Sequence, residues 1–213
     1  MRSRAAVVQA ARTLFLQKGY AGTTMEEIAE LAGVTKRTVY NNYTDKQALF
    51  TQIVADVIAY AEEFARGLPA EFTIDITANL PAALHDLGRR FALAIVRPEV
   101  IALRRLLIGE GRAFPELAKE YFDRAPGRVI EALASGFEHL GRVGLLRVAD
   151  PRRAAEQFAY LVVGAPLDRA ILEGTPPPEK QVVNCAREGV ETFLARYGPE
   201  ATAATRGRDC TAT

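Results

Sequence analysis

Three helix starts follow one another within Thr23–Lys46, and this spacing constrains the fold more than any other feature of the 213-residue chain. Thr24 and Glu27 have the spacing of a capping box, in which each side chain accepts a hydrogen bond from the other residue's backbone N–H. Thr35 and Asp45 are placed to cap two further helices, because short oxygen-bearing side chains satisfy the free N–H groups there. The segment therefore predicts three closely spaced helices.

The first two of these helices are joined by AGVT, in which Gly33 suits the left-handed position that ends a helix. Two short helices joined in this way have the form of a helix-turn-helix. The second one, residues 36–42, offers cations, hydroxyls and amides of the kind that contact base edges and phosphate oxygens. Its polar residues are Lys36, Arg37, Thr38, Tyr40, Asn41 and Asn42. The alternative is a helical hairpin whose charged side chains are merely solvated.

The segment Ala10–Phe50, AARTLFLQKGYAGTTMEEIAELAGVTKRTVYNNYTDKQALF, resembles the DNA-binding head of the tetracycline-repressor (TetR) family. Asn41-Asn42 and Tyr43 depart from residues that are common at these positions in the family, and the departures concern base preference. The segment Pro98–Leu133 is similar to the C-terminal domain of the AefR-like branch.

This resemblance implies a transcriptional regulator, most simply a repressor, that binds a palindromic double-stranded DNA operator as a homodimer and is released by a small molecule. By position in the family motif, Lys36, Arg37 and Asn41 are expected to contact base edges. The expected phosphate contacts are Thr24, Thr35, Thr38, Tyr40, Asn42 and Lys46.

Helical periodicity extends along the rest of the chain, and no alternating β pattern of useful length interrupts it. The expected helices after residues 4–18 and the helix-turn-helix are 46–66, 79–96, 99–111, 115–123, 126–144, 151–172 and 179–197. We predict an all-α protein with a DNA-binding domain at 1–48, a connecting helix at 46–66, a regulatory and dimerisation domain at 49–198 and a disordered tail at 199–213. GLPAEFTIDIT, residues 67–77, is a candidate boundary.

The last two helices, 151–172 and 179–197, are the expected dimer interface, which would form a four-helix bundle around a two-fold axis. Two apolar stripes support this prediction: Ala154, Ala155, Phe158, Leu161, Val162 and Ala165, and then Val182, Val183, Ala186, Val190, Phe193 and Leu194. The alternative is that both stripes are core within one chain.

An effector cavity is expected inside the second domain, and its candidate walls are the aromatic and leucine side chains of the central helices. They are Phe91, Leu103, Leu107, Phe114, Tyr121 and Phe137, with Ile95 and Phe122 nearby and His85, Arg104, Glu110 and His139 as polar candidates. Such walls favour a largely apolar ligand, although each aromatic could equally fill the core.

Charge is distributed unevenly along the chain. Seven basic and four acidic residues in 1–50 make the head mildly positive, whereas the whole chain carries a net charge of only +1.

Composition also predicts several absences. Cys185 and Cys210 suggest no disulfide framework, and no spacing of histidines or cysteines predicts a metal site, a cofactor or an enzyme. No apolar run is long enough to span a bilayer, and no signal peptide is evident, so we expect a cytoplasmic protein. A helical interaction module and a small all-α enzyme are the alternatives.

Overall fold

The computed structural model describes residues 2–71 and 79–199, and within these residues it is helical without any strand. This confirms the all-α prediction for the described chain. Residues 200–213 of the predicted tail, with Cys210, and residues 72–77 of the candidate boundary lie outside the described residues. The helices are α1 (Arg2–Lys18), α2 (Met25–Leu31), α3 (Lys36–Asn42), α4 (Lys46–Glu71), α5 (Leu80–Ile95), α6 (Pro98–Glu110), α7 (Pro115–Arg124), α8 (Pro126–Arg142), α9 (Pro151–Glu173) and α10 (Glu179–Tyr197).

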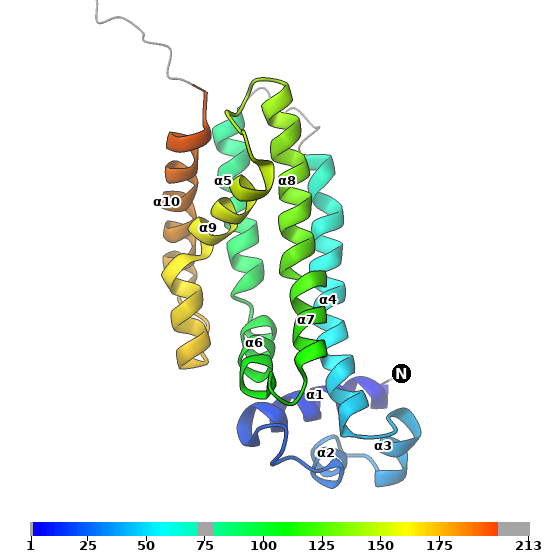
Figure 1. Cartoon of the computed structure of the whole chain (residues 1–213). Coiled ribbons are helices and arrows are strands. Elements are labelled where there is room, and N and C mark those ends of the chain that lie inside the picture. The colour runs from blue at the N-terminus through cyan, green and yellow to red at the C-terminus, as the bar shows by residue number, and fades with distance from the viewer. Residues whose placement is uncertain (1, 72–78, 200–213) are drawn as a thin grey trace, which may run out of the picture.

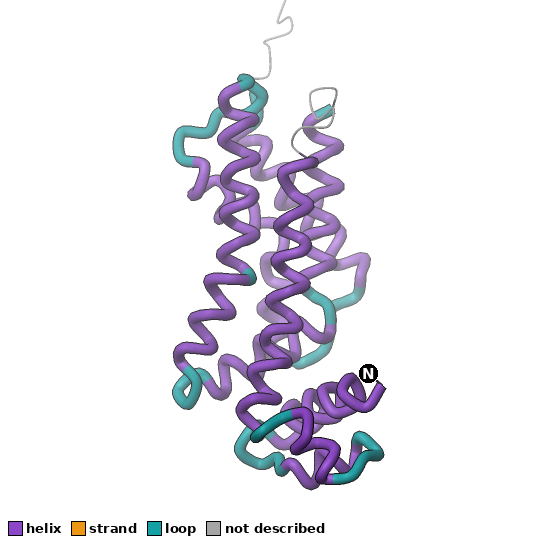
Figure 2. The backbone as a smooth tube through the Cα atoms, turned by 90° about the vertical axis from the view of Figure 1, so that its right-hand side faces the viewer, coloured by secondary structure: helices purple, strands orange, loops and turns teal. Residues whose placement is uncertain are grey.

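Figure 1 shows a small head, made by α1, α2 and α3, at one end of a long helical body. The long helix α4 leaves the head and runs along the body beside α8, and α10 lies against α5 and α9. The view turned by 90° shows the same division, with the head below and the long helices side by side above it (Figure 2). No described helix combines the length and the apolar character that a membrane span requires.

The head forms around apolar side chains that recur at helical spacing. Val7, Ala11 and Phe15 of α1 are buried against Ile28 of α2 and Val39 of α3. This core fixes α2 and α3 relative to each other, and the exposed side of α3 is therefore held in a constant orientation on the head.

A second core fills the body and includes three phenylalanine rings that contact one another, two of the pairs edge-on. Phe137 of α8, Phe158 of α9 and Phe193 of α10 are each fully buried, and their ring centroids lie 5.0–5.4 Å apart. Glycines allow the helices to approach closely: a Cβ on Gly189 would lie 2.5 Å from the Leu161 carbonyl oxygen. The backbones of α9 and α10 consequently approach each other directly at Gly189 and Leu161.

The two apolar stripes predicted for a dimer interface mostly belong to this internal core. Most members of both stripes are fully buried within the single chain; they are Ala154, Ala155, Phe158, Val162, Val182, Ala186, Val190 and Phe193. Periodicity identified the apolar faces correctly, but α5 and α8 cover them. Leu161 and Ala165 remain exposed.

Two helices differ from the expected ones. α4 continues past residue 66 to Glu71, because Leu68 is buried in the body core and anchors an additional turn. α9 was expected to be continuous but is kinked at Gly164, which has φ 34° and ψ −142°. Pro166 lies two residues later, where it has no N–H to donate and its ring excludes the carbonyl of the preceding turn. The kink divides α9 into two arms.

The head and body are joined by more than α4. The head core also contains Leu103, Leu106 and Leu107 of α6 and Tyr121 of α7. At the loop between α6 and α7, Phe114 packs edge-on against Tyr20 and Phe50, with ring centroids 4.8 and 5.3 Å away. The Tyr20 backbone N–H donates to Glu110 Oε1 at 3.2 Å. The α6–α7 corner therefore lies directly on the head.

Candidate DNA interface and internal cavity

The first helix of the motif, α2, begins with the predicted capping box. The backbone N–H of Glu27 donates to Thr24 Oγ1 at 3.2 Å, and the Thr24 N–H donates to Glu27 Oε2 at 2.9 Å. Lys18 of α1 pairs with the same carboxylate at 2.6 Å. Hydrogen bonds from Lys18 first, and then from Thr24, lower the pKa of Glu27 to about 2. The cap thus fixes α2 to the end of α1.

The turn and the start of α3 also follow the predicted pattern. Gly33 adopts φ 66°, the left-handed conformation that glycine tolerates. Thr35 caps α3, and its Oγ1 accepts from the Thr38 N–H at 3.2 Å and lies 2.9 Å from Thr38 Oγ1. These bonds use the Thr35 and Thr38 side chains locally, but they leave Thr35 exposed at the tip of the head.

One side of α3 is polar and exposed, and Val39 on the opposite side is fully buried. The exposed group, here called the α3 face, consists of Lys36, Arg37, Tyr40 and Asn41. Spacings of one, four and five residues place these side chains on neighbouring parts of the helix surface. Tyr40 is 48% exposed, although it is an aromatic residue. The structure therefore brings the three expected base-contacting residues together.

Two residues of the predicted set make local contacts as well. Lys36 Nζ lies 3.2 Å from Glu26 Oε1 of α2, an exposed pair that DNA phosphates could replace at little cost. The backbone N–H of Glu26 at the start of α2, and then Lys36, lower the pKa of the Glu26 carboxyl group. The Asn42 amide donates to the Thr38 carbonyl at 2.7 Å.

Lys46 has a different environment from the expected phosphate contact. Its ammonium donates to the carbonyls of Tyr20 at 2.6 Å and Thr23 at 2.7 Å, and it lies 4.4 Å from the centre of the Tyr20 ring. A further carbonyl, that of Ala21, lies at 3.4 Å. Lys46 thus closes the turn between α1 and α2 from inside the head.

Arg4 was not among the predicted site residues, although it positions the far end of α3. Its Nε donates to the Tyr43 hydroxyl at 3.1 Å, and its Nη2 donates to Gln52 Oε1 at 2.9 Å. Tyr43 is the C-cap of α3, so Arg4 links α1, α3 and α4. A sequence pattern gives no sign of this contact, because the partners lie 39 and 48 residues away.

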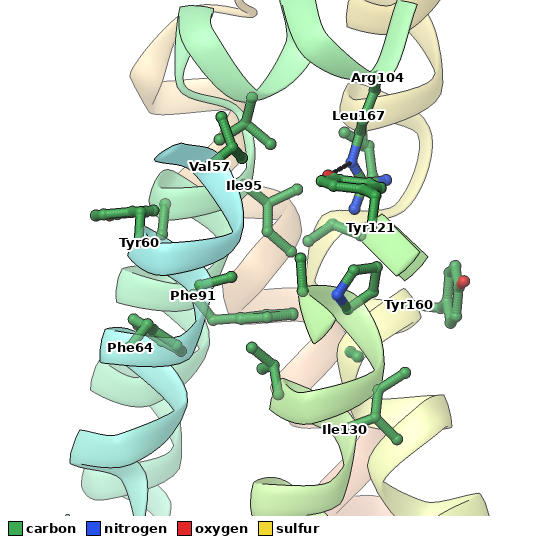
Figure 3. Close-up of a pocket in the computed structure, with 18 residues that line it drawn as sticks. Val57, Tyr60, Phe64, Phe91, Ile95, Arg104, Tyr121, Ile130, Tyr160 and Leu167 are labelled. Atoms are coloured by element: carbon green, nitrogen blue, oxygen red, sulfur yellow. Dashed lines mark hydrogen bonds between the residues drawn. The ribbon is translucent and has the colours of Figure 1, made fainter. Parts of the chain in front are cut away.

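A cavity lies in the body between α4, α5, α6, α7, α8 and α9 (Figure 3). The cavity itself holds about 80 Å³, whereas all the space between its walls, including the part open to solvent, is about 720 Å³. Phe64 and Phe91 lie on one side of it, and Arg104 and Tyr121 lie on another. Arg104 Nε donates to the Tyr121 hydroxyl at 3.2 Å.

Of the six residues expected to line a cavity, Phe91 and Tyr121 do so, and Arg104 and Ile95 from the wider prediction also contribute. Leu103, Leu107 and Phe114 are instead part of the core shared with the head, and Phe137 is buried among the body rings. The walls that the prediction omitted come mainly from α4, α8 and α9. Tyr60 and Phe64 lie one helical turn apart on α4, and this aromatic spacing could have identified the α4 wall from the sequence.

His85 and His139 do not line this cavity, and Glu110 contacts the head. Among the described residues, no group of three histidine, cysteine or acidic side chains is arranged to hold a metal ion.

Comparisons with known proteins agree with this division of the chain. Residues 7–53 match the family model for bacterial regulatory proteins of the tetR family, and residues 82–199 match the model for the AefR-like transcriptional repressor C-terminal domain. A crystal structure from Mesorhizobium loti, described as a TetR-family transcriptional regulator, is 31% identical with a TM-score of 0.80, and the match covers 92% of this chain and 97% of that one.

Two further relatives show how far the similarity extends. The flavonoid-responsive regulator FrrA is 30% identical with a TM-score of 0.66, over 94% of this chain and 99% of that chain. The transcriptional regulator TtgR of Pseudomonas putida is 33% identical over 73 residues, which cover 34% of this chain and 35% of TtgR. The alignment thus spans about a third of the length of that curated relative.

Proposed function

The chain belongs to the TetR family of transcriptional regulators, which bind DNA through a helix-turn-helix and are not enzymes. From that premise, we propose that the chain is a repressor and that a small, largely apolar ligand releases it from a palindromic operator. The α3 face is the observation that carries this proposal. Its cations and amide are exposed together on a helix whose start, end and buried side are all fixed.

In this proposal α3 lies in the major groove, where Lys36, Arg37 and Asn41 contact base edges. Thr24, Thr35, Thr38, Tyr40 and Asn42 contact the flanking phosphates, partly through backbone N–H groups at the helix starts. Lys46 acts indirectly, because its ammonium already binds the carbonyls that shape the head. Arg4 likewise acts by holding Tyr43.

Two copies of the chain are needed for useful specificity, because one head contacts only a few base pairs. We place the dimer contact on the exposed sides of α9 and α10. The stripe residues that are buried within the chain are excluded from this contact. A two-fold axis through these helices would present two heads to the two halves of a palindrome.

The ligand acts in this proposal by changing the distance between the heads. The cavity is smaller than the few hundred Å³ that a drug-sized ligand occupies, so its walls must separate when the ligand enters. α4 and α6 form part of those walls, and both also contribute to the head core. A ligand that prefers the opened cavity therefore favours another head position, which is the condition for shifting the equilibrium. FrrA, by its name a flavonoid-responsive regulator, is consistent with an aromatic effector.

The proposal is tested by selecting operators from random DNA with the purified protein and then comparing variants on the selected site. We expect Arg37→Ala to weaken operator binding by about 1–3 kcal/mol and to relax specificity at one base pair, while binding to random DNA changes less. Arg128→Ala on α8, far from the α3 face, is the matched control and should bind as the wild type does. Equal weakening on operator and random DNA would contradict the base-contacting role of Arg37, and failure to select any site would contradict the function.

A further inference from the structure

The cavity in the body has one charged residue, Arg104, among the residues that line it in the described chain. The rest of its wall is aliphatic or aromatic apart from the hydroxyls of Tyr60, Tyr121 and Tyr160. A guanidinium in such surroundings is costly unless an acceptor or an opposite charge satisfies it. The chemistry of Arg104 therefore decides which ligands suit the cavity.

Other arginines near the cavity are paired with acids, and Arg104 is not. Arg97 lies 3.6 Å from Glu99, and Arg124 binds Glu62 at 3.0 Å. In the part of the chain that the structure describes, Arg104 has no carboxylate partner, and its one side-chain hydrogen bond runs from Nε to the Tyr121 hydroxyl. The terminal Nη groups of Arg104 thus keep their donors for another acceptor.

Tyr121 strengthens this preference for an acceptor. Because its oxygen accepts the hydrogen bond from Arg104, its own hydroxyl hydrogen remains available to donate. Tyr121 is 7% exposed, so its ring is fixed and its hydroxyl is held beside the guanidinium. Arg104 and Tyr121 together offer several donors and a positive charge, an arrangement suited to a carboxylate or a sulfonate.

We infer that the cavity takes amphipathic organic anions, with the acid group on Arg104 and Tyr121 and the apolar body extending toward Phe64 and Phe91 (Figure 3). This inference rests on the proposed function in treating the cavity as the effector site. The aromatic rings alone would also attract an organic cation. A cation, however, would meet the unpaired charge of Arg104 and no carboxylate, so the wall selects against it.

The cavity has exposed residues at two opposite edges. Tyr60 and Tyr160, which lie at these edges in Figure 3, are 39% and 62% exposed, whereas Phe91 and Tyr121 are buried. A flat apolar body that enters must separate the walls, since the closed cavity holds only about 80 Å³.

The test compares two fluorescent probes that share a ring system, anilinonaphthalene sulfonate and the uncharged phenylnaphthylamine, in titrations of the full-length protein. We expect the wild type to bind the sulfonate about ten-fold or more tightly than the amine, as a charge-assisted hydrogen bond implies. Arg104→Met should abolish this preference and leave affinity for the amine nearly unchanged. Arg104→Lys should retain part of the preference, and Arg128→Met, on the body surface, should retain all of it.

Two results would overturn the inference: equal binding of both probes by the wild type, or a preference for the sulfonate that persists in Arg104→Met. Circular dichroism of each variant separates a lost site from a lost fold. DNA binding by the ligand-free proteins tests the proposed function independently, and Arg104→Met should bind the operator as tightly as the wild type does. A wild type that bound no operator but still distinguished the probes would refute the repressor function and leave the anion site standing.

Discussion

At the residue scale, Glu27 makes the stability of the head depend on pH. Its pKa is lowered to about 2, because Lys18 and Thr24 bind the ionised carboxylate in the folded protein. A lowered pKa means that the ionised form stabilises the fold above the ordinary pKa, and that this contribution is lost as the pH falls toward 2. We expect Glu27→Gln to be less stable than the wild type at pH 7, with a difference that shrinks on acidification.

Thermal unfolding followed by circular dichroism at several pH values measures this difference. Glu30→Gln is the matched control, because Glu30 lies on the same helix and its carboxylate takes no part in the cap. A Glu27→Gln difference that stayed constant between pH 7 and pH 3 would contradict the role assigned to the carboxylate.

Local rules account for what the sequence could predict at this scale. Caps at Thr24 and Thr35 and the turn at Gly33 involve residues within a few positions of one another, so their pattern is visible in the chain. Lys46 could not be assigned in the same way, because the carbonyls that hold it lie 23 to 26 residues earlier. A lysine at a helix start can bind either a DNA phosphate or the carbonyls of a nearby turn, and only the fold distinguishes these two roles.

At the scale of the element, the kink in α9 depends on Gly164. An alanine there would adopt φ 34°, which L-residues rarely tolerate, and its Cβ would lie 3.1 Å from Cys185 Sγ. We expect Gly164→Ala to lower the free energy of unfolding by about 1–3 kcal/mol, measured by urea denaturation. Adding Cys185→Ala to this variant removes the thiol and should restore only the part of the lost free energy that comes from the close contact between the new Cβ and the sulfur. Full recovery in the double variant would mean that the backbone conformation contributes nothing.

Helical periodicity identified which faces are apolar, but not what each face packs against. The stripe on α9 could have met a second chain, yet α5, α8 and α10 of the same chain cover it. Phe137 shows the same limit: its spacing marks it as inward, and only the three-dimensional packing places it among Phe158 and Phe193 instead of in the cavity. The kink itself had a visible signal, since Gly164 and Pro166 are both poor residues for a helix interior.

At the scale of the whole molecule, we expect a dimer of the 23.2 kDa chain at micromolar concentration. Two positions on α9 test the dimer interface and the core of one chain separately. Leu161 is 36% exposed, and Phe158 is fully buried. Leu161→Glu should shift sedimentation velocity profiles toward the monomer, whereas Phe158→Ala should lower the melting temperature without favouring the monomer. A wild type that sedimented as a single chain would contradict the dimer.

The contact of the α6–α7 corner with the head limits how this protein can be recombined with its relatives. Tyr20 and Phe50 meet a ring and a carboxylate from residues 110–114, and three leucines of α6 complete the head core. A chimera that joined another head to this body just after residue 50 would place foreign side chains against that surface. The unit that keeps the head core complete is therefore discontinuous in sequence: the first four helices together with α6 and α7.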